Sequence, residues 1–525
     1  MARSMPEKFP DNLPMITDHH PGMEKRTYDI EVITPLFGGG VEAGRVDPEH
    51  PIRESSIRGH LRFWWRATKG AEFSDIGKLR QRESEIWGST ENPSPVEIDV
   101  SITESGQASP CGDYRWNQRR RNGRGGYDLY WWNGQRSMDA PAFLYTLFPY
   151  QGKAPDSPDP CDPSHTILSA KFSLTIGIPD EDRMELFRPV YNGQREKENK
   201  RRKEENAKRR ERKQSLLPLL PLLQKEDSDI TRHIEAAVWA WVNFGGIGAR
   251  TRRGCGALFC SKITPGFSGQ FSFVPQNGDH ATICSWYSSA LKYFRISPPS
   301  APLMWTTLPR EIYVKSPVLT DPDRKNPVDK WAEAVGTMQQ FRQGIGIGRD
   351  AGPGLSRWPE AESLRDYVYG PSRTQRPTHH VRPKRIHRVD PRKKGITAFP
   401  RVEFGMPIIL EIKDEGIKPT LQPSEAIDRM ASPLILRPLK SGDGSCASLI
   451  IRFCTPLLTS AYVKPGDPDR DDNTQMARPI VRNEIVKPSL TTYTDSPMAT
   501  LCSTGSALDA FMSFAERRNG FQKVS

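Results

Sequence analysis

The stretch that decides the fold runs Ile57-Arg58-Gly59-His60-Leu61-Arg62-Phe63-Trp64-Trp65-Arg66-Ala67-Thr68-Lys69. On a helix of about 100° per residue, the large apolar side chains share one face. The cations share an adjacent face: Arg58, Arg62, Arg66 and Lys69. A tryptophan-rich buried side beside a cationic stripe is typical of a helix that is anchored on a sheet and touches phosphates. An ordinary amphipathic helix with a solvated basic face explains the same spacing equally well.

The segments around this helix predict a split βαβ arrangement. An alternating apolar and polar strand pattern covers 28–34, and Ser55 and Ser56 are plausible N-caps of the helix. Strand patterns follow near 96–102 and 167–178, a helix begins after Ser228 or Asp229, and a strand lies near 257–263. The order strand, helix, strand, strand, helix, strand is the ferredoxin-like βαββαβ pattern.

A second, weaker copy of this order predicts an α+β protein with two ferredoxin-like, RRM-like domains and long insertions. Its elements are a strand at 311–314, a helix at 328–341, strands near 401–413 and 447–454, and a final helix near 507–518. The predicted organisation is an N-terminal arm (1–24), an N-terminal domain (25–265), a connector (266–308) and a C-terminal domain (309–525). Insertions are expected near 107–164 and 193–215, the latter a charge run that is read as a solvated helix or a mobile insertion, or as a holder of RNA or a partner.

Composition favours a polyanionic partner and excludes several classes of protein. The 525 residues carry a net charge of +12, which makes nucleic acid a more probable partner. No apolar run approaches the roughly 18 residues of a membrane span, and the N-terminus lacks a signal-peptide core. The eight cysteines are scattered without a C-x-x-C pair. We therefore expect a soluble, reduced, cytoplasmic protein with no membrane contact.

A second informative element is the loop FGGIGARTRRGCG at 244–256. Its glycines let backbone N–H groups approach an anion, and three arginines add charge-assisted phosphate contacts. The loop follows a helix and precedes a strand, which is the reverse of the order in a dinucleotide fingerprint or a P-loop. A grip on a nucleic-acid backbone is the better interpretation, and a structural turn with exposed arginines stays open.

Together these motifs resemble the RAMP superfamily of CRISPR proteins. The motifs are TPLFGGG (34–40), RESSIRGHLRFWWRA (53–67) and GGIGARTRRGCG (245–256), and they are specific in combination. They are most similar to the first-numbered RAMP subunit family of the type III-B Cmr effector complex. Four stretches of the second half agree: FRQGIGIGRD (341–350), SRWPEAESLR (356–365), FPRVEFGMPI (399–408) and MASPLILRPL (430–439).

The resemblance implies a binding and assembly role without catalysis. Members of this family help to hold the 3′ part of the guide crRNA, capture complementary target RNA in antiviral defence, and dock on other Cmr RAMP subunits of the ribonucleoprotein. By motif position, the implied RNA-contact residues are Arg58, Arg62, Arg66, Gly246, Gly248, Arg250, Arg252 and Arg253, with Gly39, Gly40, Arg342 and Arg437 as weaker candidates.

The sequence also contains features that bear on catalysis, metal binding and protein contacts. His60 could serve a metal-independent endoribonuclease that processes guide precursor, although a structural histidine is the more usual outcome. His379, His380 and His387 lie among many cations, and Asp18-His19-His20 lies in the arm, so the sequence predicts no metal and no cofactor. The aromatic and arginine-rich part of 107–164 could stack bases or pack on its own domain. A scaffold that touches only proteins is a third possibility.

Overall fold

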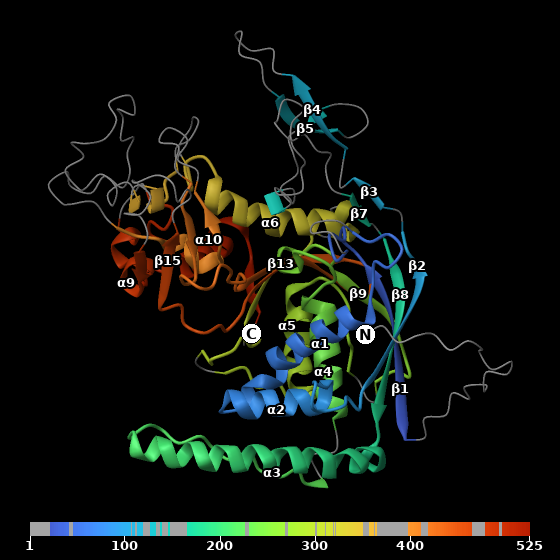
Figure 1. The fold of residues 1–525 in the computed structure, drawn as a ribbon. Helices are drawn as coiled ribbons and strands as arrows, with labels where there is room; N and C mark the ends of the chain where they lie inside the picture. The colour runs from blue at the N-terminus through green and yellow to red at the C-terminus, as the bar shows by residue number, and fades with distance from the viewer. Residues whose placement is uncertain are drawn as a thin grey trace, which may run out of the picture. The chain divides into compact units, whose positions relative to one another are not determined.

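The computed structural model contains a mixed α+β chain with several antiparallel sheets (Figure 1), which confirms the α+β part of the predicted fold class. It describes residues 22–40, 46–106, 165–167, 169–225, 230–267, 271–299, 302–309, 311–318, 322–349, 356–361, 397–410, 418–464, 478–492 and 496–524, with a few shorter stretches, mainly between 107 and 150. Residues 1–21 of the predicted arm, and His379, His380 and His387, lie outside the described residues, and the last residues of the predicted arm belong to the first strand.

The first sheet has the strand order β2-β8-β1-β9. Its strands are β1 (Met23–Val32), β2 (Glu97–Glu104), β8 (Lys171–Pro179) and β9 (Leu258–Thr264). In chain order this is 2-3-1-4, the order that the βαββαβ pattern predicts. Between the strands lie helices α1 (Glu54–Lys69), α2 (Ile76–Trp87), α3 (Glu181–Glu211) and α4 (Thr231–Phe244), and α1 packs against α4.

The second sheet repeats this order with strands β13-β14-β10-β17. These are β10 (Ile312–Lys315), β13 (Leu434–Lys440), β14 (Cys446–Arg452) and β17 (Gln522–Val524). Helix α6 (Pro327–Gln343) follows the first strand of this sheet and α10 (Ala507–Asn519) precedes its last strand. A third sheet has the order β11-β12-β15-β16, with strands Ile408–Ile409, Thr420–Gln422, Ser460–Lys464 and Arg478–Val481.

Several predicted elements differ in detail from those observed. Helix α1 begins at Glu54, and its N-cap is Arg53, whose side chain pairs with Asp47 at 2.5 Å, so Ser55 and Ser56 lie inside the helix. The strand predicted near 401–413 is shorter than expected: a 3-10 turn covers Pro400–Phe404, Gly405 ends it at φ +111°, and the strand β11 covers only Ile408–Ile409. The predicted connector contains helix α5 (His280–Tyr293), capped by Asp279.

Strands also occur in the long first insertion. Strand β3 (Ala108–Pro110) pairs with β7 (His165–Ile167), and β4 (Asp113–Gln118), β5 (Tyr127–Trp132) and β6 (Ser137–Met138) form a small sheet. The side chains of its aromatic residues lie outside the described part of the chain.

The chain divides into two compact units. The larger one includes Thr27–Glu83 and Thr231–Ser525, and the smaller one includes Ser84–Glu97 and Ile176–Ile230. Strands β1, β2 and β8 and helix α2 continue from one unit into the other. None of the helices in the described ranges has the length and hydropathy that a membrane crossing requires.

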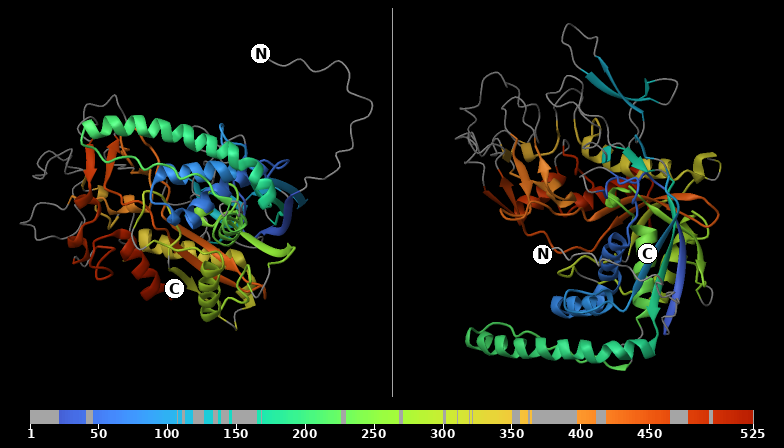
Figure 2. Two further views of the ribbon diagram at one scale, coloured as in Figure 1. Left: turned by 90° about the horizontal axis from the view of Figure 1, so that it is seen from below. Right: turned by 45° about the vertical axis from the view of Figure 1, so that its right-hand side comes forward.

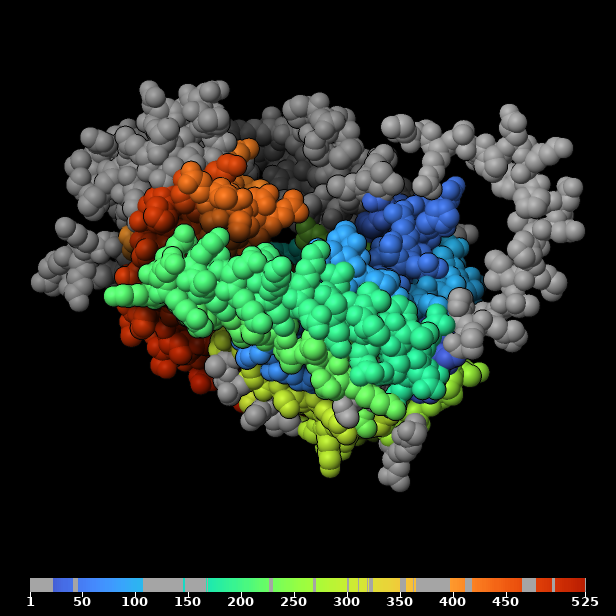
Figure 3. Space-filling model, turned by 60° about the horizontal axis from the view of Figure 1, so that its bottom comes forward, coloured from blue at the N-terminus to red at the C-terminus, as the bar shows by residue number. Residues whose placement is uncertain are grey.

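The main part of the smaller unit is helix α3 with the segment 212–225 that returns along it (Figures 2 and 3). The charge run at 193–215 is helical as far as Glu211, which agrees with the helical alternative of that prediction. Every seventh residue is an asparagine that bonds the backbone of a leucine in the returning segment: Asn192 with Leu223, Asn199 with Leu220 and Asn206 with Leu217. Arg195 and Glu85 form an ion pair beside them, at 2.7 Å and nearly without exposure.

Candidate nucleic-acid interface

The two glycine-rich motifs of the first half form one double loop. The N–H of Ala249 donates to the carbonyl of Phe37 at 2.6 Å, and the N–H of Gly256 donates to that of Pro35 at 2.9 Å. The Thr34 hydroxyl donates to the carbonyl of Gly254 at 2.6 Å. Segments 34–40 and 245–256 therefore act as a single structural element, although they lie about two hundred residues apart.

Packing explains the glycines of this double loop. A Cβ on Gly248, which has φ +81°, would lie 2.5 Å from the carbonyl oxygen of Phe37. A Cβ on Gly246 would lie 2.7 Å from the carbonyl oxygen of Gly256. Gly39 is exposed and faces Gly248, and Gly40 is the partly buried residue after it. The glycines thus allow the two backbone segments to approach each other closely. The functional side chains of the loop are those of the three arginines.

Three arginines leave the loop in different directions. Arg250 adopts a left-handed conformation at φ +59°, and a 3-10 turn over Thr251–Arg253 ends at Gly254. The Arg250 guanidinium donates to the carbonyl of Thr146 at 2.7 Å, that of Arg252 donates to Ser432, and that of Arg253 reaches Phe404 at 3.4 Å. Each of the three guanidinium groups therefore donates to a neutral backbone carbonyl.

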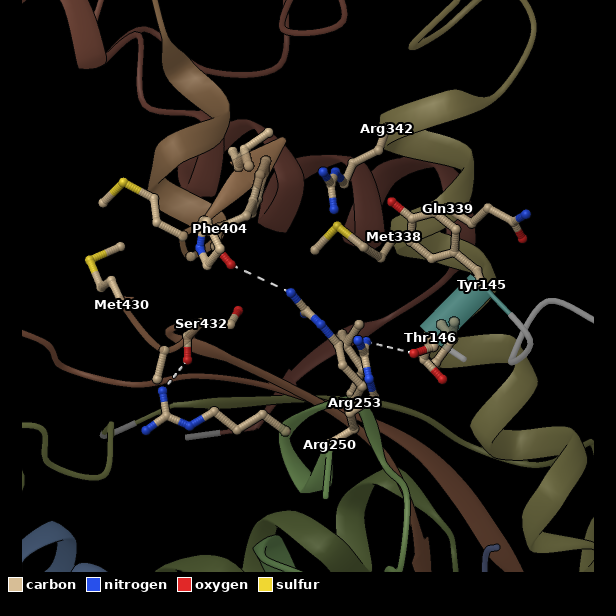
Figure 4. Close-up of a pocket in the computed structure, with 18 of the residues that line it drawn as sticks. Tyr145, Thr146, Arg250, Arg253, Met338, Gln339, Arg342, Phe404, Met430 and Ser432 are labelled. Atoms are coloured by element: carbon tan, nitrogen blue, oxygen red, sulfur yellow. Dashed lines mark hydrogen bonds between the residues drawn. The ribbon is translucent and has the colours of Figure 1, made fainter. Parts of the chain in front are cut away.

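These side chains border a cavity of about 970 Å³ in the larger unit (Figure 4). Arg342 enters the cavity from α6, on the side opposite to the glycine loop. Figure 4 shows the side chain of Arg253 extending from the loop into the cavity. Among the described residues that line this cavity, none is aspartate, glutamate or histidine. Apolar side chains complete the wall: Val335, Met338, Phe404, Met406, Ile408, Met430 and Leu436. We call this space the arginine cavity.

Two guanidinium groups of the arginine cavity keep unused donors. Nη1 of Arg253 and Nε of Arg342 are buried and have no hydrogen-bond partner among the residues that the structure describes. Burial and, after it, the nearby charge of Arg342 lower the pKa of Arg253 to about 10. Both groups remain charged at neutral pH, so an anion that enters the cavity supplies the partner that these donors lack.

The arginines of α1 have a different environment. Arg62 and Arg66 both donate to Oε1 of Glu83, at 2.7 and 2.5 Å, and about a third of each side chain is exposed. Arg58 is partly buried, and burial lowers its pKa. None of the three lines the arginine cavity, so the structure separates this predicted stripe from the loop arginines.

Arg437 lies in the core, away from any surface that RNA could reach. Its guanidinium is fully buried and donates to the carbonyls of Val242, Gly245, Leu258 and Pro438 at 2.6–3.1 Å. Since Val242 and Gly245 stand at the end of α4, Arg437 satisfies carbonyls that the helix leaves unpaired. The structure therefore places this predicted RNA contact in a structural position.

Sequence reasoning missed part of the cavity wall. Tyr145 belongs to the long insertion, and the Arg342 guanidinium lies 5.9 Å from the centre of its ring. Ser432 and Phe404 contribute backbone carbonyls, which leave no signal in residue type. Both residues lie in motifs that the sequence singles out, FPRVEFGMPI and MASPLILRPL. The motifs do not show that the backbone carbonyls of these two residues accept from the arginines.

The structure describes the surroundings of His60 and allows a search for metal ligands among the described residues. The His60 ring stacks on Trp241 at 6.2 Å between centroids, and burial lowers its pKa. Within the ranges that the structure describes, no three His, Cys, Asp or Glu side chains gather as metal ligands would.

Comparison with known proteins gives one family and two named relatives. Residues 29–259 match the model of the RAMP superfamily. The CRISPR system Cmr subunit Cmr1-2 of Pyrococcus furiosus is 36% identical over 83 residues, which cover 16% of this chain and 42% of the relative. Cmr subunit Cmr1-1 of the same organism is 41% identical over 59 residues, 11% of this chain and 18% of the relative. The chain thus spans less than half the length of either relative.

Solved structures with similar backbones are more distant in sequence. The crystal structure of Cmr1 from Pyrococcus furiosus in its apo form is 14% identical, with a TM-score of 0.41, and the match covers 96% of this chain and 99% of that one. A cryo-EM structure of type III-B Cmr-beta bound to cognate target RNA contains a chain that is 10% identical, with a TM-score of 0.40, covering 87% and 98%.

Proposed function

We propose that this chain, whose residues 29–259 match the model of the RAMP superfamily, is a non-catalytic RNA-binding subunit of a type III-B CRISPR (Cmr) effector. In this role it helps to hold the 3′ part of the guide crRNA, takes part in the capture of complementary target RNA, and docks on other Cmr RAMP subunits. The two curated relatives are named as Cmr subunits, which supports this assignment.

The observation that carries the proposal is the arginine cavity. Arg250, Arg252, Arg253 and Arg342 border one space, and the described lining offers them no carboxylate. Several guanidinium groups that border one space lined by no acidic residue are typical of a site whose anion arrives as a ligand. A phosphate group supplies several acceptor oxygens, which suits the unused donors of Arg253 and Arg342.

A polynucleotide fits this space better than a small anion does. The cavity has a volume of about 970 Å³, far beyond what one phosphate fills. Methionine and phenylalanine side chains line it beside the arginines, so sugars and bases find apolar contacts next to the phosphate donors. The net charge of +12 would also draw a polyanion toward the protein.

The absence of catalysis is part of the proposal. The described lining holds no imidazole or carboxylate that could move a proton at a phosphodiester. The alternative, an endoribonuclease for guide precursor, would depend on His60, which has no place in this lining. Cleavage of repeat RNA by the purified chain, lost in His60→Ala, would replace the binding role with the enzymatic one.

The test compares the affinity of the purified chain for labelled single-stranded RNA with that of Arg253→Gln/Arg342→Gln. We expect the double variant to bind at least about 10-fold more weakly, since it loses charge-assisted hydrogen bonds. The matched control is Arg517→Gln/Arg518→Gln, which removes the same charge from the exposed end of α10. Equal losses in both variants would reduce the effect to net charge and refute the site.

A further inference from the structure

A second cavity, of about 180 Å³, lies next to the arginine cavity. It opens between helix α1, the glycine loop and the residue that follows β14. Thr251 and Arg252 line both cavities, so the two spaces meet at the loop. The other lining residues are His60, Phe63, Trp64, Phe244, Gly245, Gly246, Ile435 and Phe453. We call this space the aromatic pocket.

The walls of the aromatic pocket are aromatic rings held at fixed angles. Phe63 stands edge-on to Trp64 at 5.3 Å and to Phe453 at 5.9 Å between centroids. The Arg252 guanidinium lies 5.4 Å from the centres of both phenylalanine rings. Trp64 and Phe453 are buried, whereas Phe63 is partly exposed. Phe63 therefore gives the pocket an aromatic surface that a planar ligand can reach from solvent.

His60 supplies a polar edge to this pocket. Its ring nitrogens have no hydrogen-bond partner among the residues that the structure describes, although the ring stacks on Trp241. Burial lowers the pKa of His60, so at neutral pH the ring is uncharged. A neutral imidazole carries one donor and one acceptor nitrogen, which matches the mixed edge of a nucleobase and suits a phosphate less well.

We propose that the aromatic pocket receives one unpaired nucleobase of the RNA strand whose backbone binds in the neighbouring arginine cavity. This inference rests on the proposed function and adds to it a place that holds one base of the strand. The pocket has a volume of about 180 Å³, which leaves room for one planar base. Arg252, shared by both spaces, joins the base to its phosphate.

Stacking is the main contact in this arrangement, so the pocket fixes position along the strand without demanding a particular base. Every base has a π-face, and stacking on a protein aromatic is sequence-tolerant. Such a seat suits a subunit that must accept guides of any sequence. It sets the register of the strand relative to the arginines and leaves the remaining bases free to pair.

The test is an abasic scan with the full chain and single-stranded RNA oligonucleotides. Each oligonucleotide lacks one base and keeps all of its phosphates. We expect the loss of one base in the protein-bound register to weaken binding by about 5- to 150-fold, the range of base–aromatic stacking. This penalty should vanish in Phe63→Ala, return in Phe63→Tyr and shrink in His60→Ala. The control is Phe187→Ala. Phe187 is a partly exposed aromatic residue of α3 that lines neither cavity, so this variant should keep the penalty.

The outcomes separate this inference from the proposed function. An abasic scan that is flat in the wild type, or identical in the wild type and Phe63→Ala, overturns the base pocket. If Arg253→Gln/Arg342→Gln still weakens binding in that experiment, the RNA-binding role stands and only the pocket assignment fails. If neither the arginines nor the aromatic residues affect binding, both proposals fail together.

Discussion

The side-chain amide of Asn199 bonds both backbone groups of Leu220, accepting from its N–H at 2.7 Å and donating to its carbonyl at 2.8 Å. The same pair of bonds joins Asn206 to Leu217 and Asn192 to Leu223. Seven helical residues advance about 10.5 Å, and the three residues that separate successive leucines can span this distance only when the returning segment is extended, at about 3.5 Å per residue. The asparagines thus replace the strand partner that the returning segment lacks.

Removing one of these asparagine side chains should release the returning segment from α3. In Asn199→Ala, both backbone groups of the buried Leu220 lose their partners, at a cost of about 1–3 kcal/mol each. We expect faster proteolysis and faster amide exchange over 215–224. Lys200→Ala changes an exposed neighbour on the same helix and should leave both rates unaltered. Equal protection in Asn199→Ala and the wild type would show that the leucines alone hold the segment.

Arg437 should be essential for stability. Arg437→Met leaves the carbonyls of Val242, Gly245 and Leu258 unpaired in the core, and each unpaired group costs about 1–3 kcal/mol. We expect the free energy of unfolding in urea to fall by at least about 3 kcal/mol. The control Arg429→Met removes an arginine whose side chain is 83% exposed and should change it little. Equal stability of the two variants would contradict the structural role.

Two glycine substitutions should change the stability of the fold in opposite directions. Gly248→Ala places a Cβ 2.5 Å from the carbonyl oxygen of Phe37 at a left-handed position, which costs at least about 1–2 kcal/mol. Gly59→Ala fills open space on α1 and replaces a poor helix former, which gains about 0.5–1 kcal/mol. Thermal unfolding of both variants tests the double loop directly. A stable Gly248→Ala would mean that segments 34–40 and 245–256 do not pack as described.

Acid should destabilise the fold through His233. Its Nδ1 accepts from the indole N–H of Trp65 at 3.1 Å, and burial, with Arg82 and Lys69 nearby, lowers its pKa to about 3. An unfolded histidine titrates near 6.5, so this contribution is complete above that pH and is lost as pH falls toward 3. At pH 5 the loss is on the order of 2 kcal/mol.

The control for this effect is His233→Gln, whose amide oxygen can still accept from Trp65 but does not titrate. The difference in unfolding free energy between pH 7 and pH 5 should shrink in the variant by on the order of 2 kcal/mol. The same pH dependence in both proteins would show that His233 is already protonated in the folded state.

The strand and helix order could be predicted from the sequence because each element carries its own periodic signal. The strand at 28–34, the tryptophan-rich helix and the helix after 230 follow local patterns, and the structure has them. The pairing of α3 with 212–225 could not be predicted in this way. The returning segment has no periodicity that names its partner, and its bonds use backbone groups.

The site was predictable only in part, for a related reason. The loop arginines and Arg342 were identified, but the carbonyls that hold three of them come from Thr146, Ser432 and Phe404. Arg437 carries the same charge as these residues, and only its burial shows that it serves the end of α4. Residue type gives the charge, whereas tertiary packing decides whether that charge faces a ligand or the core.

The most direct test of the arginine cavity is the salt dependence of RNA binding. For single-stranded RNA the slope of log affinity against log salt is about −0.7 per neutralised phosphate. If Arg253 and Arg342 each neutralise one phosphate, the slope of Arg253→Gln/Arg342→Gln is shallower than that of the wild type by about 1.4. An unchanged slope would mean that these two guanidinium groups do not touch the RNA backbone, and it would contradict the account.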